Sequence, residues 1–148
     1  MNTATKVEEA ARWRLAIGES LVAGGFTWIA FPRPQVSLLF IARRPHLVGI
    51  SDRRLMIWAR PHEVRPAEDQ DLVLDAMFTE VTVEAVRTLS PMLQLRLATA
   101  SGRKLVLEFR PRDRKLGHQI AEALGGPGGA VGASDGSEPP STEVPAAT

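Results

Sequence analysis

Apolar and polar residues alternate along much of the chain between about residues 20 and 110, as they do in half-buried β-strands. The clearest stretch is residues 92–98, where apolar and polar side chains take turns (Leu93, Gln94, Leu95, Arg96, Leu97). Residues 104–110 repeat the pattern, which predicts Leu105, Leu107 and Phe109 on the inner face and Val106, Glu108 and Arg110 on the outer face. A glycine turn, residues 100–103, joins the two stretches, so we expect an antiparallel hairpin.

A second hairpin is predicted from residues 46–51 and 54–59. Its corner is Ser51-Asp52, whose short side chains can accept hydrogen bonds from nearby backbone N–H groups. Further strands are expected at residues 20–31, 72–74 and 81–86, and Gly24-Gly25 predicts a bulge or bend in the first of them. Residues 36–42 fit a short helix or a strand equally well, because seven apolar-leaning residues do not reveal their period.

Two helices flank the predicted strands. Residues 7–17 are good helix formers, with Thr5 as a capping residue, and Trp13 and Ile17 four positions apart predict one packed face. Residues 112–124 form an amphipathic helix that ends at Gly125, because its large apolar side chains recur every fourth position (Leu116, Ile120, Leu124). The chain therefore divides into a helical lead-in (1–17), a mainly β domain (18–124) and a Gly/Pro-rich tail (125–148) that we expect to be disordered.

The composition of the chain indicates its cellular compartment and excludes some kinds of chemistry. The chain has no cysteine, which removes thiolate catalysis and Cys-ligated zinc and fits a reducing compartment. Charged residues interrupt the first twenty positions, so no export signal is visible. Residues 21–42 are very apolar, but Pro32-Arg33-Pro34 breaks them where a helix would have to cross a bilayer. A cytoplasmic protein is predicted, with peripheral membrane contact as the alternative.

No enzyme chemistry is predicted. The three histidines (His46, His62, His118) are scattered, and neither a nucleophile motif nor a phosphate-binding glycine loop is present. The acidic set Glu68, Asp69, Asp71 and Asp75 lacks the glycine and terminal glutamate of a calcium loop, so a solvated linker is the better interpretation. We therefore predict no catalytic residue, no metal, no cofactor and no small-molecule substrate.

The order of about seven antiparallel strands followed by one helix resembles the bacterial pleckstrin-homology-like (PH-like) family. The resemblance is carried by the hairpin Val48-Gly-Ile-Ser-Asp-Arg-Arg-Leu-Met-Ile57, by Gly102-Arg-Lys-Leu-Val-Leu-Glu-Phe109 and by Gly18-Glu19 ahead of the first strand. It implies a bent sheet or barrel closed by the C-terminal helix, with Leu116 and Ile120 in its apolar interior. Such folds bind phosphoinositides, peptides or copies of themselves, so the resemblance implies no single function.

The charge of the chain is segregated, with seven Lys or Arg against two Asp or Glu in residues 33–66 and eight against two in residues 85–115. The candidate ligand-binding residues are Arg43, Arg44, Arg53 and Arg54, with Arg60 as a further member. If they shared one face, they would attract an anionic membrane at about 1 kcal/mol each. The alternative is that one hairpin arginine pairs with Asp52 or another carboxylate and the rest are ordinary surface charge.

Two functions are therefore predicted. The first is a non-catalytic PH-like module that binds a protein partner or itself, for which Trp13 is the most plausible exposed aromatic. The second is a module that binds an anionic membrane or ligand through the arginines. Nucleic acid is not expected as a partner, because the chain has no tyrosine and its other aromatic residues fall on core-facing strand positions.

Overall fold

The computed structural model describes residues 2–32, 42–61, 67–89 and 91–126. Two α-helices, α1 (Thr3–Arg12) and α2 (Arg114–Ala123), lie near the two ends of this part of the chain. Between them lie the strands β1 (Leu21–Ala30), β2 (Arg44–Ser51), β3 (Arg54–Ala59), β4 (Leu72–Met77), β5 (Val81–Leu89), β6 (Met92–Thr99) and β7 (Lys104–Phe109). Short 3-10 turns, η2 (Asp69–Asp71), η3 (Phe78–Glu80) and η4 (Pro111–Asp113), precede β4, β5 and α2.

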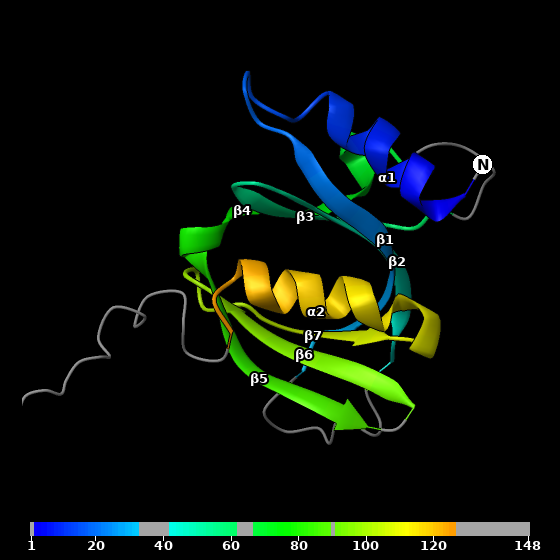
Figure 1. The fold of residues 1–148 in the computed structure, drawn as a ribbon, viewed down its shortest axis with the longest axis vertical. Coiled ribbons are helices and arrows are strands. Elements are labelled where there is room, and N and C mark those ends of the chain that lie inside the picture. The colour runs from blue at the N-terminus through cyan, green and yellow to red at the C-terminus, as the bar shows by residue number, and fades with distance from the viewer. Residues whose placement is uncertain (1, 33–41, 62–66, 90, 127–148) are drawn as a thin grey trace, which may run out of the picture.

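All seven strands belong to one antiparallel sheet with the order β4-β3-β2-β1-β7-β6-β5. The sheet is strongly bent, and α2 lies inside the bend while α1 lies outside it along β1 and β2 (Figure 1). The predicted architecture of about seven antiparallel strands, a short N-terminal helix and a closing C-terminal helix is therefore confirmed.

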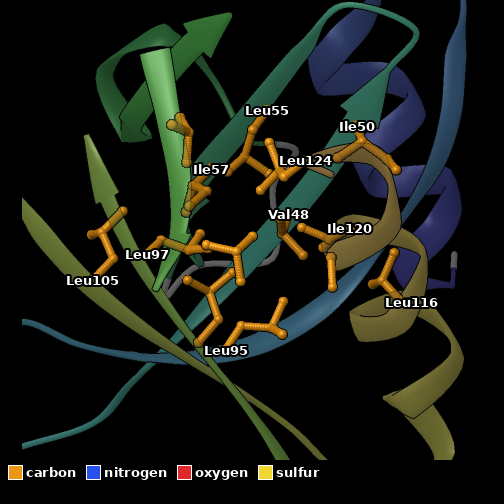
Figure 2. Packing of buried hydrophobic residues seen from close by; sticks show 14 of the residues in the cluster. Val48, Ile50, Leu55, Ile57, Leu95, Leu97, Leu105, Leu116, Ile120 and Leu124 are labelled. Carbon is orange, nitrogen blue, oxygen red and sulfur yellow. The ribbon is translucent and has the colours of Figure 1, made fainter. Parts of the chain in front are cut away.

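The main core fills the space between α2 and the inner face of the sheet. Figure 2 shows Leu116, Ile120 and Leu124 of α2 turned toward apolar side chains of the strands, among them Val48 and Ile50. Ile120 and Val48 have no exposed surface. The four-residue spacing on α2 thus places its apolar stripe against the sheet, as predicted.

A second, smaller core lies on the other face of the sheet, beneath α1. A Cβ atom on Gly24 would lie 2.5 Å from Cγ1 of Val7 in α1, and one on Gly49 would lie 2.7 Å from the same atom. A Cβ on Gly25 would instead meet Leu116 of α2 at 2.7 Å. Consecutive residues of β1 therefore face opposite helices, and their glycines allow both helices to approach the strand closely.

The bulge predicted at Gly24-Gly25 is wrong. These glycines pair in regular register with Gly49 and Val48, and the register shift lies between Leu21 and Ala23. The close approach of α1 and α2 accounts for glycine at these two positions.

The first helix differs from its prediction at both ends. It begins at Thr3 because the side chain of Asn2 accepts a hydrogen bond from the backbone N–H of Thr5 at 2.9 Å. It ends at Arg12, so Trp13 and Ile17 follow it in the chain. The prediction that these two side chains share a packed face is wrong, since Trp13 is 86% exposed and Ile17 fully exposed.

Val106 and Glu108 lie opposite Leu105, Leu107 and Phe109, as the alternation predicted, and both are buried as well. Glu108 accepts a hydrogen bond from Gln94 of the neighbouring strand at 3.0 Å, and it pairs with Arg43. Strands β4 and β5 form the two edges of the sheet, and β5 has a bulge between Val83 and Ala85.

Two predictions fall largely outside the described residues. Residues 36–41 of the segment that fitted either a helix or a strand are among them, and so are residues 127–148 of the expected disordered tail. The division into lead-in, domain and tail stays a prediction.

Candidate functional site

The four arginines predicted as a ligand site lie near opposite ends of β2. Arg43 and Arg44 are at its start, whereas Arg53 and Arg54 are in the turn after it and at the start of β3. The eight residues of β2 span about 23 Å at roughly 3.3 Å per residue. The structure therefore brings each pair together but does not bring the two pairs into one patch.

Arg54 is half-buried and belongs to an ion-pair network. Its guanidinium binds Glu19 through two hydrogen bonds, Nε to Oε2 and Nη2 to Oε1, each 2.8 Å long. Its Nη1 lies 3.3 Å from both carboxylate oxygens of Asp75 in β4. Ser51 completes the corner, since its hydroxyl donates to Glu19 and accepts the backbone N–H groups of Arg53 and Arg54. This arginine thus holds the hairpin to the chain ahead of β1.

The network continues to the segment after α1. Arg14 donates from Nε to Asp75 at 2.9 Å and from Nη1 to Asp69 at 3.0 Å. The hydrogen bond with Asp75 raises the pKa of Arg14, and the hydrogen bond with Glu19 raises that of Arg54. Asp69 and Asp75 therefore act as partners of arginines, and the predicted solvated linker is tied to α1 at this point.

The pKa of Glu19 is shifted far from its ordinary value. Burial opposes its ionisation, but hydrogen bonds from Arg54, Ser51 and the Ala16 N–H outweigh burial and lower its pKa from 4.5 to about 2. A carboxylate held ionised in this way, with its oxygens occupied by protein donors, is suited to holding elements together. The interpretation of one hairpin arginine as paired with a nearby carboxylate fits Arg54, although the partner is Glu19 and not Asp52.

A separate group of basic residues lies around η4 and the start of α2. Arg60 and Arg110 both lie over the ring of Phe26, with their Cζ atoms 5.8 Å and 4.2 Å from its centroid. The backbone N–H of Arg60 donates to the carbonyl of Pro45, next to Arg44. Arg112 and Lys115 follow Arg110 in the chain and are exposed. We call Arg44, Arg60, Arg110, Arg112 and Lys115 the basic corner.

Sequence reasoning found only Arg44 and Arg60 of the basic corner. The excess of eight basic residues over two acidic ones in residues 85–115 contained the signal for the others. It was missed because bringing Arg110 beside Arg60 requires the pairing of β1 with both β2 and β7.

A hollow in the surface lies between α1 and the segment that precedes β4. It encloses about 500 Å³. The exposed indole of Trp13 stands at its edge. We call this hollow the α1 groove, and its lining consists of Glu9, Ala10, Arg12, Trp13, Ala67, Glu68 and Asp69. The lining carries three carboxylates and one guanidinium, and one of these carboxylates, Asp69, pairs with Arg14.

Two further observations concern metal binding and membrane-spanning helices. Within the described ranges, no three His, Asp or Glu side chains are grouped so that they could hold a metal ion. Within the same ranges, no helix is long and apolar enough to span a bilayer.

Comparison with known proteins identifies the fold. No family model and no curated protein matches the sequence. The linker-DH/PH domains of p115-RhoGEF match over 80% of this chain and 33% of that chain, at 18% identity and a TM-score of 0.50. The fold is PH-like. Vav1 with an allosteric inhibitor matches over 71% of this chain and 26% of the other, at 15% identity and a TM-score of 0.49. This chain spans a third or less of either, and such likeness shows the fold alone.

Proposed function

We propose that this PH-like chain is a non-catalytic interaction module that binds a protein partner or a second copy of itself through the α1 groove. The observation that carries the proposal is the placement of Trp13. Its indole is 86% exposed, although the other two tryptophans are packed into the fold, Trp58 completely. A large aromatic side chain at the rim of a hollow is typical of a binding hot spot.

The charge of the groove indicates what the partner presents. Glu9 makes no ion pair with any described residue, Glu68 is exposed, and Asp69 pairs with Arg14 although its side chain is 77% exposed. Arginine or lysine side chains suit such a lining, because they pair with carboxylates and also lie favourably over an indole ring. A basic segment is therefore the expected ligand.

The test is a titration of the full chain with an oligo-arginine peptide at low salt, followed by Trp fluorescence. The difference between wild type and Trp13→Phe isolates the signal of Trp13, which we expect to change with saturation. Glu9→Gln should weaken binding, whereas Arg87→Ala, a change at an exposed residue of β5, should leave it unchanged. A Trp13 signal that does not respond to the peptide would reject the proposal.

The basic corner favours a second candidate function, peripheral contact with an anionic membrane. Each basic residue near such a surface contributes about 1 kcal/mol, so the contact would be transient and sensitive to salt. Flotation with phosphatidylserine vesicles should be lost on changing Arg44, Arg60 and Arg112 together to Glu. Arg53, which is exposed at the far turn, serves as the control. A ligand-binding role for Arg43, Arg44, Arg53 and Arg54 as one set stays a prediction.

A further inference from the structure

Building on the proposed function, we infer that the α1 groove of one copy binds η4 and the first turn of α2 from a second copy, through Arg112 and Lys115. The proposed function requires only that some basic segment binds in the α1 groove. This inference names that segment and predicts self-association.

Arg112 and Lys115 are suited to this contact. Arg112 lies in η4 and Lys115 in the first turn of α2, so both stand where the chain enters the helix. Both are exposed, and neither makes an ion pair within the described part of the chain. Arg110 differs, because it pairs with Asp113 at 2.7 Å and stacks on Phe26. Arg112 and Lys115 are therefore available to carboxylates from outside.

The helix itself favours an acidic partner at this point. The first turn of a helix carries partial positive charge from its unpaired N–H groups, so basic side chains there are unfavourable and carboxylates are favourable. α2 has Lys115 in that turn and no acidic residue in it. Docking into the α1 groove would place the carboxylate of Glu9, which makes no ion pair with a described residue, next to both the lysine and the helix terminus.

A second copy must supply this turn. Gly24 faces Val7 of α1 whereas Gly25 faces Leu116 of α2, so the two helices lie on opposite faces of β1. Figure 1 shows the same arrangement, with α1 outside the bent sheet and α2 inside it. The start of α2 therefore does not reach the groove of its own chain. Exchanged reciprocally about a two-fold axis, this contact closes a dimer; made once per pair, it leaves one groove and one α2 terminus unoccupied and continues to a ring or a chain.

The experiment is sedimentation velocity on the full chain at low salt over a range of concentrations. We expect the average mass of wild type to rise with concentration and to fall again when salt is added. Glu9→Lys alone and Lys115→Glu alone should each weaken association by about tenfold or more. Glu122→Lys, which makes the same charge change as Glu9→Lys at an exposed position near the other end of α2, should associate like wild type.

Mixing the two weakened variants is the decisive step. Glu9→Lys makes its groove more basic, and Lys115→Glu makes the start of its α2 more acidic. An equimolar mixture should therefore regain association that neither variant shows alone. Circular dichroism of each variant shows that it is folded.

The inference is overturned if wild type stays monomeric at low salt, if Glu9→Lys and Lys115→Glu both match the Glu122→Lys control, or if the mixture stays monomeric. The oligo-arginine titration separates this result from failure of the proposed function. If the chain binds the peptide through Trp13 but stays monomeric, the proposed function stands and the inference is rejected. If the chain neither binds the peptide nor associates, both the proposed function and the inference are rejected.

Discussion

Arg54 binds both carboxylate oxygens of Glu19, a residue 35 positions earlier in the chain, through two hydrogen bonds of 2.8 Å. The side chain of Glu19 has no exposed surface, and that of Arg54 is 19% exposed. Removing one member of such a pair leaves the other buried without its counter-charge, which is costly. The stability of the corner between β2 and β3 therefore depends on a residue outside the hairpin.

We predict that Glu19→Gln lowers the free energy of unfolding by about 3 kcal/mol, because Arg54 then keeps only Asp75 as a charged partner. Urea denaturation measures the change. Glu122→Gln, at an exposed position of α2, is the matched control and should change stability by less than about 0.5 kcal/mol. A Glu19→Gln protein as stable as the control would show that the pair contributes little.

A second prediction concerns pH. The pKa of Glu19 is lowered from 4.5 in the unfolded chain to about 2 in the folded protein. The folded state therefore favours the ionised form, so this contribution to stability is fully present above pH 4.5 and is lost as the pH falls through about 2. Denaturant midpoints measured from pH 6 downward should fall more steeply for wild type than for Glu19→Gln. Parallel curves for the two proteins would contradict the assignment.

The third prediction tests how α1 is attached. Gly49→Ala should destabilise the protein by about 1–3 kcal/mol, because the new methyl would lie 2.7 Å from Cγ1 of Val7. Val7→Ala removes that atom, so the double variant should be more stable than the sum of the two single changes predicts. Val22→Ala, at an exposed valine, replaces Val7→Ala in the control cycle, which should be additive. Equal coupling in both cycles would reject the contact as the cause.

The fourth prediction separates the exposed tryptophan from the buried one. Trp13→Ala should change the free energy of unfolding by less than about 0.5 kcal/mol, whereas Trp58→Ala should cost about 3–5 kcal/mol, because Trp58 has no exposed surface. Thermal or urea unfolding of both variants measures the difference. A large loss for Trp13→Ala would mean that its indole supports the fold, and the groove would lose its main evidence.

The strands were predictable because their signal is local. Alternation within residues 92–98 and 104–110, with a glycine turn between them, is enough to predict the pairing of β6 with β7. The C-terminal helix was predictable for the same reason, since Leu116, Ile120 and Leu124 repeat at a helical spacing.

The charged contacts were not predictable, because they depend on how distant segments align. Arg43 and Arg54 look alike as members of charged Arg-Arg pairs. The arrangement of strands and of the segment ahead of β1 decides that Arg43 meets Glu108 and that Arg54 meets Glu19. The exposure of Trp13 was only half predictable, since a helical spacing with Ile17 favoured burial and the early end of α1 removed that spacing.

The edge strand β5 bears on how this protein can assemble. An unpaired strand edge is a template for adding another strand, which is the usual route to fibres. Here the bulge between Val83 and Ala85 interrupts the hydrogen-bonding row, and the exposed Arg87 adds charge beside it. Both features oppose extension of the sheet from one molecule to the next. We therefore expect this edge to resist the strand addition that leads to cross-β aggregates.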